Sequence, residues 1–451
     1  MTAQSSVSPS DDDSVTQHGS PLYKDIAEDE TLFRHYFDVE STVEFVRNYS
    51  LKRLALQVPD YLTWASARLA ALLKVETGSE AFILADSTFS DCCVDEIAAE
   101  HINSDGIVHY GYRACLSQTS RLPVHHVFGS LPIDVDAFID AWSSLLHLTG
   151  DVVVFADLHF MPSLVSINDR LPSNVQLATI GNRCAGYDFS GTPSALVHIG
   201  NDDNIRTVMS LHFSHARMFV YEPNSRSANT PGIVEVNPER SRALMRRRRY
   251  LIEKVKDSSV IGIVVGTLAV SGYLDCIAHL RHVIRQSGRK SYTLAVGRPN
   301  VPKLANFTSI DIFVMVSCPL SSIIDSFEYT ADIVTPVEIE MALSRAYPSE
   351  RPYTTDFHAI LDTTNHVLNR HDRAGTTSEC DDEAEVPRFS LITGKLVSNS
   401  AGSSLLPNEL NTVAVVSEQR TFTGLDPQIG CTPIVPAAPG QSGIPSAYRQ
   451  I

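Results

Sequence analysis

The chain has 451 residues, of which 43% are hydrophobic and 20% are charged, and its formal net charge is −16 at pH 7. This length exceeds one ordinary hydrophobic core and predicts two to four domains. The negative charge argues against broad binding to nucleic-acid phosphates, which usually needs a basic surplus. No apolar run is as long as a membrane span, and the first residues lack the pattern of a secretion signal. We expect a soluble, cytoplasmic protein whose partners are proteins or small molecules.

In the first part of the chain, short apolar runs alternate with segments of helical periodicity. The predicted strands are residues 53–58, 81–85, 106–109 and 124–128, and the predicted helices are residues 61–74 and 93–101. Such alternation is typical of βαβ units, and it predicts a mostly parallel sheet.

The same rhythm returns twice more along the chain. The middle part has predicted strands at residues 151–155, 195–199 and 217–221. The third part has predicted strands at residues 260–266, 291–296 and 311–316, and predicted helices at 273–286 and 338–345. Pro336 stands just before the last helix, at a first-turn position that suits its fixed φ. Three similar units in succession predict an α/β fold built by internal triplication of one module.

These patterns predict the following organisation. Residues 1–30 are a disordered N-terminal segment, 31–147 the first α/β domain, 148–253 the middle α/β domain, 254–368 the third α/β domain, 369–388 an acidic insertion, and 389–451 a C-terminal extension that completes the third domain.

Four of the eight cysteines lie just after predicted strands. They are Cys92 and Cys93, then Cys115, and finally Cys318 in a different domain. Residues at the carboxyl ends of parallel strands face a ligand crevice, so thiols there suggest a soft-metal site. Adjacent strands end side by side, which brings Cys115 towards Cys92 and Cys93. Cys318 can join them only if the three domains face a common centre.

The cysteine spacing leaves alternatives open. Consecutive side chains diverge, so we expect only one of Cys92 and Cys93 to be a ligand, and the sequence does not say which. About three thiolates with one open position are typical of an iron–sulfur cluster that meets an external ligand. Simple burial is the alternative, because buried cysteines are common and no Cys-x-x-Cys spacing is present. For Cys276, on a helix among leucine and isoleucine, core packing is a sufficient explanation.

Several separate motifs, in the same order, resemble one family. They are residues 92–101 (CCVDEIAAEH), 108–111 (VHYG), 114–117 (ACLS), 244–250 (LMRRRRY), 266–268 (GTL), 317–319 (SCP), 424–425 (GL) and 442–445 (SGIP). Together they closely resemble the diphthamide biosynthesis protein two family, the second subunits of the heterodimeric 2-(3-amino-3-carboxypropyl)histidine synthase. The resemblance runs from about Val43 to the C-terminus, except for the acidic insertion.

The resemblance implies three α/β domains arranged around a central 4Fe-4S cluster. Cys92 or Cys93 matches the first-domain ligand, and Cys318 matches the third-domain ligand. The catalytic subunit carries a middle-domain cysteine followed by Thr-Ser-Pro, which Cys184 in Asn182-Arg183-Cys184-Ala185-Gly186 matches poorly. Cys115 is therefore the preferred third ligand.

The resemblance also implies partners and a reaction. The catalytic first subunit of the diphthamide synthase heterodimer cleaves S-adenosylmethionine to a 3-amino-3-carboxypropyl radical, which is added to a histidine of translation elongation factor two. A small zinc-type electron donor protein supplies electrons. Because the cysteine pattern here differs from the catalytic one, we expect an accessory iron–sulfur subunit that relays electrons, with no catalytic residues assigned. A cluster-free scaffold is the alternative, and a homodimeric enzyme of the quinolinate synthase type is a more distant one.

The basic run Arg246–Arg249 has two interpretations. It could mark a contact with an anion or with the elongation factor. A charge run on a helix is more often a solvated face, and we expect that here.

Overall fold

The computed structural model describes most of the chain between residues 21 and 397. The described residues are 21–84, 92–111, 113, 121–145, 147–148, 150–168, 170–223, 232–296, 299–324, 326–344, 353–362, 388–394 and 396–397. All of them belong to one compact unit. Cys115, Cys380, Cys431 and almost all of the predicted acidic insertion lie outside the described residues.

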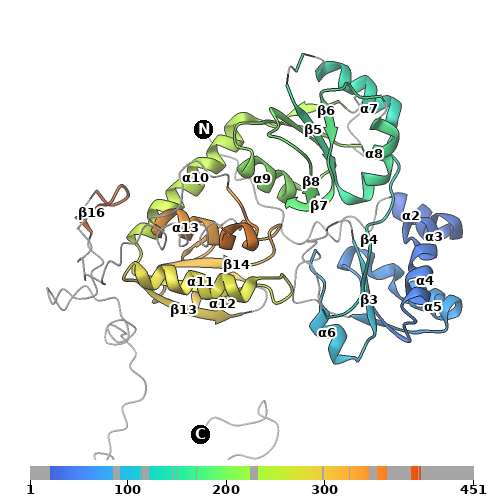
Figure 1. Cartoon of the computed structure of the whole chain (residues 1–451), viewed down its shortest axis with the longest axis horizontal. Helices are drawn as coiled ribbons and strands as arrows, with labels where there is room; N and C mark the ends of the chain where they lie inside the picture. The colour runs from blue at the N-terminus through green and yellow to red at the C-terminus, as the bar shows by residue number, and fades with distance from the viewer. Residues whose placement is uncertain are drawn as a thin grey trace, which may run out of the picture. The chain divides into compact units, whose positions relative to one another are not determined.

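The first sheet has four parallel strands in the order β2-β1-β3-β4. Its strands are β1 (Arg53–Gln57), β2 (Glu80–Leu84), β3 (Gly106–Tyr110) and β4 (Val124–Val127). Its connecting helices are the 3-10 turn η1 (Asp60–Leu62), α5 (Thr63–Thr77) and α6 (Glu96–His101). Figure 1 labels β3 and β4 of this sheet and the helices α5 and α6 beside them. Helix α5 ends at Gly78, whose φ of 74° is the left-handed conformation that glycine adopts without strain.

Three helices precede this sheet, and the first of them corrects the prediction of disorder for residues 21–28. They are α2 (Pro21–Glu28), α3 (Glu30–Tyr36) and α4 (Val39–Asn48). Helix α2 lies within the segment predicted to be disordered, and residues 1–20 lie outside the described part of the chain. The physical reason is packing: Ile26 is 5% exposed, and the Tyr23 ring meets Tyr36 and Trp64 edge to face.

The middle sheet has the order β6-β5-β9-β10-β11, with only β11 antiparallel. Its strands are β5 (Val152–Ala156), β6 (Val175–Leu177), β9 (Ala195–Ile199), β10 (Arg217–Tyr221) and β11 (Val234–Glu235). Its helices are α7 (Val135–Trp142), η2 (Ser143–Leu145), η3 (Leu158–Phe160), α8 (Met161–Asn168) and α9 (Asp203–His212). A separate hairpin consists of β7 (Thr179–Cys184) and β8 (Tyr187–Asp188).

The third sheet is again four parallel strands, in the order β13-β12-β14-β15. Its strands are β12 (Val260–Val265), β13 (Lys290–Ala295), β14 (Ile312–Val316) and β15 (Asp332–Val334). Its helices are α10 (Pro238–Asp257), α11 (Tyr273–Gln286), α12 (Val301–Ala305) and α13 (Pro336–Leu343). Two short antiparallel strands follow, β16 (Arg388–Phe389) and β17 (Leu396–Val397).

The parallel strands of all three sheets share one order. Numbered within its own module, each sheet runs 2-1-3-4, and the middle sheet adds an antiparallel edge strand. The α/β class with mostly parallel sheets is therefore confirmed, whereas descent from one triplicated module stays a prediction. In sheets of this order, ligands bind at the carboxyl ends of strands 1 and 3, where the winding direction reverses. No helix in the described ranges is both long enough and apolar enough to cross a membrane.

Helix α10 confirms the interpretation of the arginine run as a solvated face for Arg246, Arg247 and Arg249, which are exposed, and corrects it for Arg248. Arg248 is 5% exposed, and its Nε and Nη2 each donate to a carboxylate oxygen of Glu338 at 2.5 Å. Arg247 donates to Asp332 at 2.5 Å. Residues three or four apart share a helix face, so the run is divided between faces. Arg246 and Arg249 are exposed, on the face away from these ion pairs.

Candidate metal centre

Three buried thiols meet between the first and third sheets. The Sγ atom of Cys92 lies 3.2 Å from that of Cys318 and 3.8 Å from that of Cys93. All three sulfur atoms lie within 4.8 Å of one another, and no side chain among them is more than 2% exposed. The structure thus brings together residues that are more than two hundred positions apart in sequence, as the metal-site prediction requires.

The sequence predicted the wrong geometry for the Cys92–Cys93 pair. The predicted helix at 93–101 begins only at Glu96, because the Asp95 side chain caps it by accepting from the Ala98 N–H at 2.9 Å. The two cysteines therefore lie in a turn and a bend before the helix. Their side chains do not diverge there, and both sulfur atoms belong to the group. Which of them would bind a metal remains a prediction.

A buried glutamine that sequence reasoning missed holds this turn in place. Gln57 ends β1 and is 4% exposed. Its Nε2 donates to the Cys93 carbonyl at 2.8 Å, and its Oε1 accepts from the Asp95 N–H at 2.8 Å. The donor and the acceptor of one side-chain amide thus both form hydrogen bonds with backbone groups at or next to the cysteines. The signal in the sequence was a polar residue, Gln57, directly after the apolar run Leu54–Leu56.

Cys318 is placed by the switch point of the third sheet. It follows β14 by two residues, and its carbonyl accepts from the Ser321 N–H at 2.9 Å, which closes a tight turn. Directly after the neighbouring strand β12, the Gly266 N–H donates to the Val316 carbonyl at 2.9 Å. A Cβ atom at Gly266 would lie only 3.0 Å from the Met315 Sδ. The close approach of these strand ends therefore favours glycine at this position.

The other cysteines differ from this group. Cys184 is 6% exposed and lies in the same hydrophobic cluster as the three thiols, but it is not among the sulfur atoms that lie within 4.8 Å of one another. Cys276 is fully buried within α11, which agrees with its prediction as a packing residue. Burial, together with the nearby Glu340 carboxylate, raises the pKa of the Cys276 thiol to about 12, so it stays protonated at neutral pH.

The chemistry of the three thiols limits what they can hold. Soft thiolate ligands select zinc, copper(I) or iron–sulfur clusters, and they bind hard oxygen-seeking cations poorly. The residues present therefore fit a 4Fe-4S cluster, which is held by cysteine thiolates. They also fit a single zinc ion, because a Zn–S bond of about 2.3 Å places two tetrahedral ligands about 3.8 Å apart.

The middle sheet carries a different arrangement at its corresponding edge. Asp157 follows β5, and its Oδ1 lies 2.8 Å from the Nε2 of His198 in β9. Burial alone would raise the pKa of Asp157, but His198, His159 and the Asn201 N–H more than offset this and lower it. The middle module thus has a buried carboxylate–imidazole pair where the third module has Cys318.

An ion pair ties the first module to the middle one. The Nε of Arg113 donates to the Asp202 Oδ2 at 2.5 Å. The Asp202 side chain is fully buried, and its Oδ1 caps α9 by accepting from the Asn204 N–H at 2.9 Å. Arg113 precedes Cys115, the remaining predicted ligand, by two residues in the sequence, and Cys115 lies outside the described residues.

A comparison with protein-family models decides the family. The model described as "Putative diphthamide synthesis protein" matches residues 58–353, which is more than half of the chain. The chain belongs to the diphthamide synthesis protein family. The matched residues include Cys92, Cys93 and Cys318.

Curated members of the diphthamide synthesis family resemble the chain over most of its length. A chicken protein named 2-(3-amino-3-carboxypropyl)histidine synthase subunit 2 is 33% identical over 454 residues, covering 92% of each chain. A fission-yeast protein of the same name is 35% identical over 387 residues, covering 81% of this chain and 75% of that protein. These matches confirm the predicted resemblance to the second subunits of the 2-(3-amino-3-carboxypropyl)histidine synthase.

A solved structure of the family shares the fold. The crystal structure of Dph2 from Pyrococcus horikoshii with a 4Fe-4S cluster matches with a TM-score of 0.57 at 18% sequence identity. The match covers 71% of this chain and 95% of the archaeal one. At this identity the likeness establishes the three-sheet architecture and leaves the ligands to be argued from the residues.

Proposed function

We propose that the chain is the iron–sulfur subunit of the 2-(3-amino-3-carboxypropyl)histidine synthase that performs the first step of diphthamide biosynthesis in the cytoplasm. The observation that carries the proposal is the meeting of Cys92, Cys93 and Cys318 in a family whose archaeal relative holds a 4Fe-4S cluster. On this proposal Cys115 joins them as a ligand. When bound, the cluster supplies a one-electron carrier.

The proposed role is electron relay within a heterodimer. The catalytic first subunit would use S-adenosylmethionine to transfer the 3-amino-3-carboxypropyl group to a histidine of translation elongation factor two. A small zinc-type donor protein would reduce the cluster of the present chain, which passes the electron on. The name "subunit 2" of the curated relatives supports a partner subunit.

Burial of the thiols supports relay over independent catalysis. An electron can cross a packed protein core, whereas a substrate as large as S-adenosylmethionine needs an open cavity of a few hundred cubic ångströms. Cys92, Cys93 and Cys318 are at most 2% exposed, and they pack in a cluster with Phe155 and Val316. The chain's own residues thus exclude water from the thiols and hold them in one place.

Iron counting tests the proposal. The protein is co-expressed anaerobically with the catalytic subunit, and iron per heterodimer is measured together with the visible thiolate-to-iron absorption. We expect Cys318→Ser to lose most of both, because it removes the third-module thiol. Cys276→Ser is the matched control, since it removes an equally buried thiol of the same module that lies outside the group.

The scaffold alternative makes the opposite prediction. If the chain only stabilises its partner, then replacing Cys93, Cys115 and Cys318 together by serine leaves complex formation and histidine modification intact. Loss of modification, with the heterodimer still forming at the wild-type yield, would reject the scaffold and support the relay.

Gln57 provides an independent test of the site. Gln57→Glu keeps an acceptor for the Asp95 N–H but loses the donor to the Cys93 carbonyl and buries a charge. We expect a several-fold loss of iron retention at equal protein yield, measured as the rate of iron release to a chelator. The control Gln176→Glu changes a glutamine in β6 of the middle sheet, and it should release iron at the wild-type rate. Equal rates of iron release in both variants would show that the two Gln57 hydrogen bonds do not support the metal centre.

A further inference from the structure

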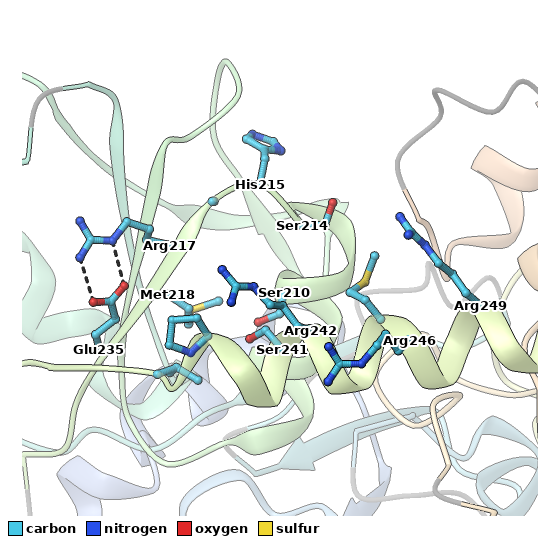
Figure 2. Close-up of a pocket in the computed structure, with 14 residues that line it drawn as sticks. Ser210, Ser214, His215, Arg217, Met218, Glu235, Ser241, Arg242, Arg246 and Arg249 are labelled. Carbon is cyan, nitrogen blue, oxygen red and sulfur yellow. Dashed lines mark hydrogen bonds and ion pairs between the residues drawn. The ribbon is translucent and has the colours of Figure 1, made fainter.

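A second site lies between the middle sheet and α10, away from the cysteines. A cavity of about 460 Å³ opens between α9, β10, β11 and α10 (Figure 2). Arg217 and Met218, which line it, are the first two residues of β10, so the cavity sits at the amino end of that strand. The carboxyl ends of the parallel strands, where Asp157 and His198 lie, are at the opposite edge of the sheet. The cavity therefore does not belong to the candidate metal centre.

The cavity has a positively charged wall. Arg242, Arg246 and Arg249 come from successive turns of α10 and line it together (Figure 2). Their spacing of four and then three residues places them on one helix face. Arg242 pairs with Glu239 at 2.6 Å, but both side chains are about two-thirds exposed, so water weakens that pair. Within the described ranges, no ion pair involves Arg246 or Arg249.

The division of the arginine run supports a separate use for this face. Arg247 and Arg248 are committed to Asp332 and Glu338 of the third module. These ion pairs explain the presence of two of the four arginines, but they do not explain Arg246 and Arg249. The chain as a whole has a net charge of −16, so most of its surface repels anions. A concave surface with several arginines has a positive potential locally and attracts them.

The remaining lining narrows the kind of ligand. Hydroxyl groups come from Ser210, Ser214 and Ser241. The one carboxylate among the described lining residues, Glu235, is bound by both Nε and Nη2 of Arg217 at 2.8 Å. The available groups are therefore mainly hydrogen-bond donors, which suit the several acceptor oxygens of a phosphate. Met218 and Met245 contribute apolar surface to the lining of the cavity. The volume lies within the range of small-molecule sites.

We propose that this cavity binds a small phosphate-bearing molecule, held by Arg242, Arg246 and Arg249 with the serine hydroxyls. The site is distinct from the metal centre and independent of the proposed electron relay. Its ligand would bind between the middle sheet and α10 while the cysteines keep their arrangement.

Calorimetric titration of the full-length heterodimer with inorganic pyrophosphate at low ionic strength tests the proposal. We expect one site per heterodimer, and at least a tenfold weaker affinity in the double variant Arg246→Gln/Arg249→Gln. The charge-matched control is Arg240→Gln/Arg285→Gln, which removes two exposed arginines that do not line the cavity. The control should bind within about twofold of wild type, after correction for the general loss of positive charge.

Two further measurements keep the result clear. Arg246→Lys/Arg249→Lys keeps the charge but loses the planar fork, and it should bind between wild type and the glutamine variant. Iron content should be unchanged in every variant, so failure here is separate from failure of the relay proposal. The proposal is overturned if wild type does not bind pyrophosphate, or if the glutamine and control variants bind alike. It is equally overturned if the glutamine variant no longer pairs with the catalytic subunit, because the arginines would then form a protein interface.

Discussion

The third and middle modules have the same strand order but use the same sheet edge differently. At the end of β14 the third module carries Cys318, whose sulfur meets the thiols of the first module. At the corresponding end of β9 the middle module carries Gly200, packed against the Asp157 carboxylate that binds His198. One edge brings soft metal ligands together across modules, and at the other a buried carboxylate, Asp157, pairs with His198 of the same module.

This difference shows that equivalent positions in two modules of the same strand order need not carry the same metal-binding side chains. Gly200 has a φ of 139°, and a Cβ atom there would lie 2.1 Å from the Asp157 Oδ2. The Asp157 side chain thus fills the space beside Gly200 at the middle edge. We infer that the middle edge serves stability and that the cysteine edge serves metal binding, and the following predictions test that division.

The largest effect should come from breaking the buried pair in the middle module. Asp157→Ala leaves the fully buried His198 without this partner, and we expect a loss of about 3–5 kcal/mol in the free energy of unfolding. Asp203→Ala, which removes a half-exposed carboxylate that pairs with Arg206, should cost less than about 1 kcal/mol. Urea titration of the metal-free protein measures both. Equal costs would show that the middle edge does not have the structural role inferred here.

Gly200→Ala should have the next largest effect. The new methyl group meets the Asp157 carboxylate, and alanine is strained at this φ, so we expect a loss of about 2–3 kcal/mol. Gly191→Ala is the control, because φ there is also positive, at 72°, but a Cβ atom would enter open space. It should cost about 1 kcal/mol. If the two variants were equally stable, crowding by Asp157 would be excluded as the cause.

The pH dependence of stability should show a smaller effect through His159. Burial is the main cause that lowers the pKa of this imidazole to about 4, below its usual value of 6.5. The folded state therefore favours the neutral ring. Its contribution is complete above about pH 6.5 and is lost as the pH falls towards 4, by about 2 kcal/mol for this partly exposed side chain.

The variant His159→Gln should remove that part of the pH dependence. The measurement is the difference in unfolding free energy between about pH 7 and about pH 5, compared between wild type and variant. A variant that loses as much stability as wild type over this interval would assign the acid sensitivity to other groups.

Cys184→Ala should have the smallest effect. Cys184 is 6% exposed, so a small cavity costs about 1 kcal/mol. Because its sulfur lies outside the group of three, iron per heterodimer should stay at the wild-type value, in contrast to Cys318→Ser. Iron loss in Cys184→Ala would show that the middle module also supplies a ligand to the metal centre. It would contradict the inference that only the cysteine edge serves metal binding.

Much of the fold could be predicted from the sequence because its central strands are buried on both faces. Strands such as β9 and β14 are continuous apolar runs, and each was placed within one residue of its observed bounds. The hairpin of β7 and β8 was missed, since its strands are short and mixed in polarity. Helix α2 was missed because its stability comes from contacts with aromatic side chains elsewhere, which composition does not reveal.

The candidate site was predictable only in part, and the reason is sequence separation. Cys92 and Cys318 were singled out by their positions after strands and by family resemblance, but only the folded chain brings them together. Local sequence contains no signal that pairs Asp157 with His198, or Arg248 with Glu338. The arginine run likewise looked uniform, but α10 places Arg248 in a buried ion pair with Glu338 and places Arg246 and Arg249 in the lining of a cavity.

X-ray absorption at the iron and zinc edges, on the anaerobically purified heterodimer, tests the central claim most directly. The account predicts iron whose nearest neighbours are sulfur, with further iron in the next shell, and loss of that signal in Cys318→Ser but not in Cys276→Ser. Zinc bound by sulfur in this chain, with no iron beyond that of the catalytic subunit, would contradict it.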